Sequence, residues 1–290
     1  MMQLKGCGTA LLTPFKQDGS IDYEAFAKTV DRQVEAGIHF LVPLGTTGET
    51  PCLSAEERVE ILRITKEHSK GLPIVAGGGT NSLEETKKSM ALLEPYGVDY
   101  FLIVVPYYNK PTQKGLYDYF KAVAASTSKQ IILYNVPGRT GANCTAETTL
   151  ALARDVENIV AVKEASGNYG QISRIIRDAP EGFSVLSGND DETLSLMATG
   201  AQGLISVASN LVPEKMVALV EALQKDDMQT ARALHYQLMP LFKACFVESN
   251  PIPAKAGMAV LGLMENVLRL PLAPATDATI DLMKQILTVG

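Results

Sequence analysis

The chain has 290 residues, of which 46% are hydrophobic and 20% are charged, and its formal net charge is −6. An acidic chain without a basic run argues against nucleic acids and anionic membrane surfaces as partners. The longest apolar run, residues 101–105, is far shorter than the ~20 residues that span a bilayer, and the N-terminus shows no signal-peptide pattern.

Eight short apolar runs typical of buried strands recur along the chain, with amphipathic segments between them. The predicted strands are residues 7–12, 39–44, 74–77, 100–105, 131–135, 159–163, 184–187 and 203–207. Strict alternation of strand and helix with short loops predicts a parallel sheet with right-handed crossovers. Eight repeats in a chain of this length favour an α/β fold of the closed (β/α)8 TIM-barrel type over an open doubly wound sheet.

Helix starts are marked by two sequence patterns of capping-box form. They are Ser54-x-x-Glu57 and Ser82-x-x-Glu85. Apolar residues at helical spacing over 216–223 predict the helix that follows the eighth strand.

The residues after the eighth unit exceed what a barrel needs. We therefore expect a catalytic barrel over residues 1–225 and a C-terminal helical extension over 226–290, which together form one structural unit. Segments 254–263 and 279–287 are two candidate helices of this extension. A third is marked by apolar residues at helical spacing: Leu234, Leu238, Leu241, Phe242 and Cys245. We expect the extension to pack on the barrel or on another subunit.

Lys163 ends the sixth predicted strand and is the most informative residue of the chain. Side chains alternate along a strand, so Lys163 is expected to share a face with Ala161 and Ile159. An ammonium on a buried face costs several kcal/mol unless it is paired or neutral. A neutral lysine amine is also the nucleophile that forms Schiff bases with ketones. A lysine at a strand end is more often solvated or ion-paired, so this residue alone does not decide between the two readings.

Other strand ends carry polar residues where an α/β barrel places its chemistry. The hydroxyls and free N–H groups of Thr46 and Thr47, in the loop 45–49, can hold a carboxylate, although such a glycine-rich loop equally caps a helix. A positioned tyrosine can shuttle protons in Schiff-base chemistry. Arg139 offers a fork suited to a carboxylate, but a surface ion pair is the usual fate of a loop arginine.

Four motifs, in this order, resemble the pyruvate-dependent class I aldolase family, and within it the dihydrodipicolinate synthase branch. The family also contains N-acetylneuraminate lyase. The motifs are residues 45–49 (GTTGE), 107–109 (YYN), 134–141 (YNVPGRTG) and 162–165 (VKEA). The resemblance runs from Gly6 to the C-terminal helices.

The resemblance implies a role for each matching residue. Lys163 would form the Schiff base with pyruvate, and Tyr134 would move protons during imine formation and C–C bond formation. Thr47 and Tyr108 would complete a proton relay, with Tyr108 reaching in from a neighbouring subunit. Thr46 and Thr47 would hold the pyruvate carboxylate.

The resemblance also implies the reaction. Arg139 would orient the carboxylate of aspartate semialdehyde, and Gly188 and Ile205 would line the pyruvate pocket through backbone carbonyls. An arginine at position 139 favours a small acidic aldehyde over a sugar. The expected enzyme is a lyase of diaminopimelate and lysine biosynthesis that makes 4-hydroxy-tetrahydrodipicolinate. It would need no cofactor and would form a homotetramer, as a dimer of dimers, in the cytoplasm.

Two alternatives stay open on the sequence. One is a related lyase that acts on a sugar acid, such as N-acetylneuraminate or a 2-keto-3-deoxy sugar acid. The other is a non-catalytic member of the fold that binds a small ligand.

An allosteric lysine site is implied by the same resemblance. Asn81, Glu85 and Tyr107 match the pocket of lysine-inhibited members, whereas Ala55 and Arg58 stand where sensitive enzymes commonly place histidines. A cationic Arg58 would repel a cationic effector. We therefore expect weak or absent inhibition by lysine.

The sequence offers no metal-binding pattern. His39, expected inside a strand, His68 and His235 are too few and too dispersed for a metal-dependent aldolase. The four cysteines are scattered, which suggests reduced thiols in the cytoplasm: Cys7, Cys52, Cys144 and Cys245.

Two other features weigh against competing sites. The acidic run 188–191 argues against a phosphate site after the seventh strand. Lys255 is a rival lysine, but it lies outside the predicted strands, so a role in packing or at an interface is expected.

Overall fold

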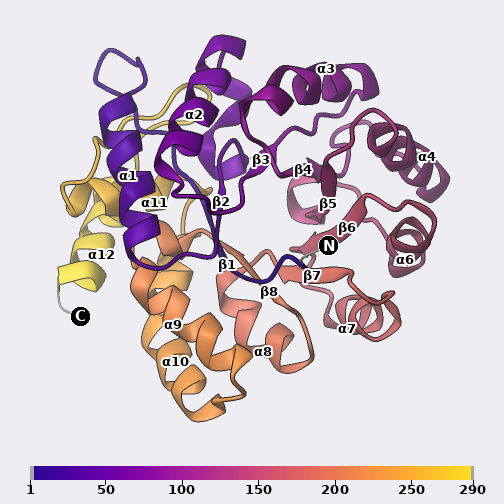
Figure 1. Ribbon diagram of the computed structural model, residues 1–290. Helices are drawn as coiled ribbons and strands as arrows, with labels where there is room; N and C mark the ends of the chain where they lie inside the picture. Colours follow the sequence, from indigo (N-terminus) through magenta and orange to yellow (C-terminus); the bar gives the residue numbers. More distant parts are fainter. Residues whose placement is uncertain (1–2, 289–290) are drawn as a thin grey trace.

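The computed structural model describes residues 3–288. Its eight parallel strands are each followed by helical segments that form a ring around them (Figure 1). The strands are β1 (Gly6–Ala10), β2 (Phe40–Val42), β3 (Val75–Gly77), β4 (Tyr100–Val104), β5 (Gln130–Asn135), β6 (Ile159–Glu164), β7 (Ser184–Ser187) and β8 (Gly203–Ser206). All eight predicted strands are confirmed, and no strand end differs from the predicted one by more than two residues.

The sheet closes into a barrel. Its hydrogen-bonded order is β2-β1-β8-β7-β6-β5-β4-β3. The gap between β2 and β3 is bridged where the N–H of Leu41 donates to the carbonyl of Pro73 (3.0 Å) and the N–H of Gly77 donates to that of Pro43 (3.1 Å). The predicted (β/α)8 barrel is therefore confirmed.

Nine helices separate or follow the strands in the described barrel. They are α1 (Tyr23–Glu35), α2 (Ala55–His68), α3 (Leu83–Leu93), α4 (Gln113–Ala124), α5 (Pro137–Thr140), α6 (Ala146–Asp155), α7 (Tyr169–Asp178), α8 (Thr193–Ala198) and α9 (Pro213–Gln224). None of the helices in the described part of the chain is long and apolar enough to cross a membrane.

The two predicted capping boxes differ in outcome. Ser54 and Glu57 form a complete box at the start of α2, with both side chain–backbone hydrogen bonds present. At the start of α3 the Ser82 hydroxyl accepts from the N–H of Glu85, but the Glu85 carboxylate pairs with Lys88 at 2.8 Å instead of returning to Ser82. The second box is therefore only half formed, because a cation one turn along the helix provides a competing partner.

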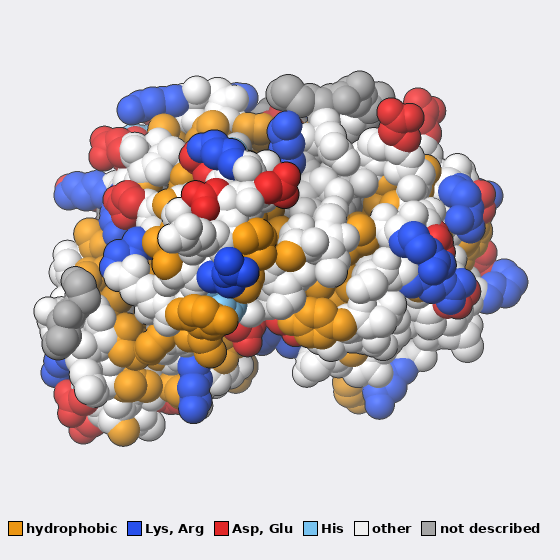
Figure 2. Space-filling model, turned by 90° about the horizontal axis from the view of Figure 1, so that it is seen from below, with side chains coloured by type: hydrophobic (Ala, Val, Ile, Leu, Met, Phe, Trp, Pro, Cys, Tyr) orange, Lys and Arg blue, Asp and Glu red, His pale blue; other side chains and the backbone are white. Residues whose placement is uncertain are grey.

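Three helices follow the barrel: α10 (Met228–Ala244), α11 (Ile252–Val260) and α12 (Asp277–Thr288). Figure 1 places α10 beside α9, and α11 and α12 on the side of the barrel that carries α1. Figure 2 looks at the molecule from the α9–α10 side, where hydrophobic side chains lie among charged ones. Tyr236 and Met239 of α10 are exposed.

The core has two separate parts. One fills the layer between strands and helices, and the other fills the inside of the barrel with side chains from every strand. Ile159 belongs to the outer part, while both Val160 and Ala161 pack inside. The reason is a β-bulge, since Ile131 pairs with Ile159 but the next residue of β5 pairs with Ala161. The prediction that Ile159 shares a face with Lys163 is therefore wrong, whereas Ala161 does share it.

Candidate active site

Lys163 and Tyr134 lie side by side at the carboxyl end of the barrel. They are paired neighbours on β6 and β5, and both are buried. The Lys163 Nζ lies 4.3 Å from the centre of the Tyr134 ring. Within residues 3–288 this amine forms no salt bridge, so a buried lysine is presented without a carboxylate partner.

Gly188 provides the space that the Lys163 side chain occupies. A Cβ at position 188 would lie 3.1 Å from the Lys163 Cε and 2.7 Å from the Ala165 Cβ. A larger residue would therefore displace the lysine.

A deep cavity of about 60 Å³ opens beside the Lys163 side chain. At about 10–15 Å³ per water-sized group, it holds roughly four to six such groups, which suits a three-carbon acid. Its walls bring together six residues that the sequence predicts for the site: Thr46, Thr47, Tyr134, Arg139, Lys163 and Gly188.

Two predicted residues lie elsewhere. Ile205 belongs to the cluster inside the barrel and is not among the residues that line the deep cavity. Tyr108 is 88% exposed on the loop after β4, and its side chain lines neither cavity of this site.

A second, wider cavity of about 570 Å³ shares Thr46, Tyr134 and Arg139 with the first. Its lining includes Arg58 and Tyr107, two residues of the expected allosteric set. The wider cavity could hold a second reactant next to Arg139, beside a first reactant in the deep cavity.

Among residues 3–288, contacts within the expected allosteric set connect only Asn81 to a residue that lines this wider cavity. The Asn81 Nδ2 donates to the carbonyl of Tyr107 (3.3 Å), and the Nε of Arg58 donates to the carbonyl of Leu53 (3.1 Å). The carboxylate of Glu85 is occupied by Lys88 on the surface of α3.

Asn250 is a site residue that the sequence did not reveal. It lies in the loop between α10 and α11, lines both cavities and is 5% exposed. Its Nδ2 donates to the Thr47 Oγ1 (3.0 Å), and its carbonyl accepts from the Nη2 of Arg139 (3.1 Å). An asparagine in a loop more than 200 positions from Thr47 carries no local signal of this contact.

The loop that carries Thr46 and Thr47 is held by a buried ion pair. The carboxylate of Glu49 lies 2.6 Å from the Lys255 Nζ, and both side chains are fully buried. The Lys255 Nζ also donates to the carbonyl of Val267 (2.8 Å) and lies 3.9 Å from the centre of the Phe15 ring. Burial lowers the pKa of Lys255 to about 8, and the Glu49 carboxylate opposes that shift. The predicted packing role of Lys255 agrees with this position.

A second buried network lies behind the catalytic strand. The Glu164 carboxylate accepts hydrogen bonds from the Asn135 Nδ2 (2.8 Å) and the Ser166 Oγ (2.6 Å). Burial raises the pKa of Glu164, while these hydrogen bonds oppose the rise. The network joins the ends of β5 and β6, so it fixes the backbone next to Lys163 and Tyr134.

Asp190 accepts hydrogen bonds from the backbone N–H groups after β8 that a bound phosphate would require. Its buried carboxylate accepts from the N–H groups of Val207 (3.1 Å) and Ala208 (3.0 Å) and from the Ser206 hydroxyl (2.5 Å). This arrangement favours an unphosphorylated substrate.

No group of three His, Cys, Asp or Glu side chains that could hold a metal ion occurs in residues 3–288. His39 lies just before β2 rather than inside a strand, and its Nδ1 accepts from the N–H of Cys7 (3.2 Å). The prediction that His39 lies within a strand is wrong, because β2 begins only at Phe40. All four cysteines are free thiols.

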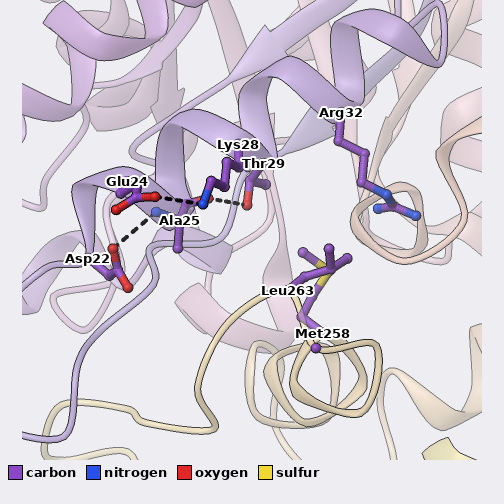
Figure 3. A pocket seen from close by; sticks show the side chains of 9 residues that line it. Asp22, Glu24, Ala25, Lys28, Thr29, Arg32, Met258 and Leu263 are labelled. Carbon is purple, nitrogen blue, oxygen red and sulfur yellow. Dashed lines mark hydrogen bonds and ion pairs between the residues drawn. The ribbon is translucent and has the colours of Figure 1, made fainter.

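Another hollow, of about 250 Å³, lies between α1 and α11 (Figure 3). Its charged groups are already bonded within the protein. Lys28 pairs with Glu24, Asp22 caps the N–H of Ala25, and Arg32 donates to two backbone carbonyls. Since it lies away from Lys163, it is not a rival for the active site.

A family model described as the dihydrodipicolinate synthetase family matches residues 3–289. The chain belongs to the dihydrodipicolinate synthetase family. The 4-hydroxy-tetrahydrodipicolinate synthase of Koribacter versatilis is 50% identical over 275 residues, which cover 94% of this chain and 91% of that protein.

Solved structures of the family have the same barrel. The dihydrodipicolinate synthase of Thermotoga maritima matches with a TM-score of 0.97 and 43% identity, over 99% of each chain. The enzyme of Cyanidioschyzon merolae, solved with lysine bound, matches with a TM-score of 0.95 and 39% identity, over 98% of this chain and 97% of that one.

Proposed function

We propose that this member of the dihydrodipicolinate synthetase family condenses pyruvate with L-aspartate 4-semialdehyde to give 4-hydroxy-tetrahydrodipicolinate. The observation that carries the proposal is the unpaired, buried Lys163 beside Tyr134, in a cavity of three-carbon size that opens into a wider one. The family membership and the names of the relatives support the same reaction.

The chemistry begins with attack of the Lys163 amine on the keto carbon of pyruvate. The carbinolamine loses water to give an imine, and loss of a proton from the methyl carbon gives an enamine. The enamine carbon attacks the aldehyde of the second substrate, and hydrolysis of the new imine frees the lysine. The product then cyclises. Every covalent step uses the substrate imine, so we propose that no further cofactor takes part.

We assign the proton transfers of these steps to Tyr134, and the packing of its ring against the amine supports this assignment. Thr46 and Thr47 line the deep cavity, and we propose that they hold the pyruvate carboxylate. We assign Gly188, which lines the deep cavity, to the pyruvate site. Ile205, which the family resemblance also implies, packs inside the barrel and does not line that cavity, so we propose that any role it has there is through its backbone carbonyl.

The exposed Tyr108 fits a role in a neighbouring copy of the chain better than in its own site. We therefore propose a homo-oligomer, a tetramer built as a dimer of dimers, in which Tyr108 completes the relay of Thr47 and Tyr134 across an interface. A cytoplasmic location is proposed with it.

The reaction is tested by comparing substrates. Purified protein with pyruvate and aspartate semialdehyde should consume both, whereas N-acetylneuraminate and 2-keto-3-deoxygluconate should be cleaved at least about 100-fold more slowly, because a site built for a charged group rejects a substrate that leaves it unpaired. Preferred cleavage of a sugar acid would contradict the proposal.

Arg139→Ala is expected to raise the KM for aspartate semialdehyde about 10- to 100-fold, since charge-assisted hydrogen bonds contribute about 1.5–3 kcal/mol. Arg139 lines both cavities, whereas Lys163 lines only the deep one. Trapping of pyruvate on Lys163 by borohydride should persist. Steady-state kinetics with each substrate varied in turn checks this, with Arg63→Ala on the surface of α2 as the control. Equal loss in both variants would contradict the assignment.

Inhibition by lysine is expected to be weak or absent, because Arg58 adds a positive charge to the region that includes Asn81, Glu85 and Tyr107. The initial rate should change by less than about twofold at 1 mM lysine, a difference in free energy below ~0.5 kcal/mol. The measurement is a lysine titration at subsaturating pyruvate. Strong inhibition at micromolar lysine would contradict this expectation.

A further inference from the structure

Asn250 makes two contacts that tie the two candidate substrate sites together. Its side chain bonds Thr47 and its backbone carbonyl bonds Arg139. The two contacts use different parts of the residue, so a substitution at position 250 removes the first and keeps the carbonyl of the second. This separation makes the role of the side chain testable.

The Asn250 amide donates to the Thr47 hydroxyl rather than accepting from it. With Nδ2 facing Thr47, the buried Oδ1 is left without a hydrogen-bond partner. The reversed amide would instead leave two buried N–H donors unpaired at that place. The observed orientation leaves the Oδ1 and one N–H unpaired, against two N–H groups in the reversed one, and it is the less costly arrangement because buried donors are satisfied more strictly than buried acceptors.

The hydrogen bond from the Asn250 amide to the Thr47 oxygen limits the directions in which the Thr47 hydroxyl can donate its own hydrogen. The oxygen is the acceptor in this bond, so the hydroxyl hydrogen remains free for a second partner. Among residues 3–288, no acceptor for it is found. Thr47 lines the deep cavity together with Tyr134 and Lys163, so the hydrogen is available on the side where the reaction takes place.

We propose that Asn250 is a positioning residue that orients the Thr47 hydroxyl, so that Thr47 donates its hydrogen into the deep cavity, toward Tyr134 or bound pyruvate. This inference rests on the proposed function, and it identifies Thr47 as a hydrogen-bond donor in the proton relay. It also assigns part of the catalytic site to the loop between α10 and α11.

The test measures exchange of the pyruvate methyl hydrogens for deuterium, by NMR, with pyruvate as the only substrate. Exchange requires proton transfer at the imine but no second substrate. Asn250→Ala is expected to slow exchange about 10- to 100-fold, the usual scale of a lost contribution to proton transfer. Borohydride should still trap pyruvate on Lys163. The KM for aspartate semialdehyde should stay within about threefold, because the backbone carbonyl that holds Arg139 is unchanged.

Two further variants separate orientation from packing. Asn250→Asp keeps the shape but replaces the donor by an acceptor, so it should slow exchange at least as much as Asn250→Ala. A packing role predicts the opposite order. In a Thr47→Val background, Asn250→Ala should cause little further slowing, because the hydroxyl it orients is gone.

Asn158→Ala serves as the matched control, since the Asn158 Nδ2 also bonds only within the protein, to three backbone carbonyls. It should lower the melting temperature without slowing exchange per folded molecule. Additive effects of the Asn250 and Thr47 substitutions, or a milder effect of Asn250→Asp, would overturn the inference. If the unsubstituted protein neither exchanges nor traps pyruvate, the proposed function itself fails.

Discussion

Lys163→Ala is expected to lower kcat by at least about 10³-fold and to abolish trapping of pyruvate by borohydride, because the side chain is the proposed nucleophile. Peptide mass analysis of the unsubstituted protein should place the reduced adduct on Lys163. The protein should remain folded, because the substitution removes a buried amine that has no carboxylate partner among the described residues.

Lys114→Ala is the matched control, because Lys114 is exposed on α4 and its ion pair within residues 3–288 is with Asp118 on the same helix. It should leave kcat and the adduct unchanged. An adduct on any other lysine, or a Lys163→Ala protein that keeps more than about a tenth of the activity, would contradict the proposed role of Lys163.

Lys255→Met is expected to destabilise the folded protein by about 3–5 kcal/mol, because it leaves the buried carboxylate of Glu49 without its cation. The backbone N–H of Arg269 still donates to that carboxylate (3.1 Å), but a single neutral donor does not replace an ammonium. At about 2–4 °C per kcal/mol, the melting temperature should fall by roughly 6–20 °C.

The double variant Glu49→Gln/Lys255→Met should lose less stability than Lys255→Met alone, since it removes both buried charges. Lys28→Met is the control for a surface pair, and it should leave the melting temperature almost unchanged, because Lys28 and Glu24 are largely solvent-exposed. The measurement is the melting temperature of the unsubstituted protein, the two single variants and the double variant. A Lys255→Met protein as stable as Lys28→Met would show that the buried pair is dispensable.

The barrel could be predicted because each strand is a short apolar run between helix signals. β7 agrees with its prediction to the residue, and each end of the other strands lies within two residues of the predicted one. The deep cavity could also be predicted in large part. Closure of the barrel brings strand ends together whatever the details of packing, so Thr47, Tyr134 and Lys163 had to meet.

What the sequence hid depends on single contacts rather than on patterns. The bulge at Ile159 changes the phase of one strand, and no periodicity within six residues reveals it. The Glu85 carboxylate could accept a hydrogen bond from the Ser82 N–H or pair with Lys88, and the sequence alone does not decide between these two partners. Asn250 becomes part of the site only through the fold, since nothing near it in the chain bears on catalysis.

The order of these contacts along the chain bears on how the enzyme is made. Thr47 and Glu49 leave the ribosome about 200 residues before Asn250, Lys255 and Arg269, the residues that bond them. At about 5–20 residues per second, that delay is roughly 10–40 seconds. A nascent barrel with all eight strands thus carries Lys163 and Tyr134 while the threonine loop still lacks its fixed partners. In the proposed mechanism, catalytic competence therefore begins only after the segment that follows the barrel has been synthesised.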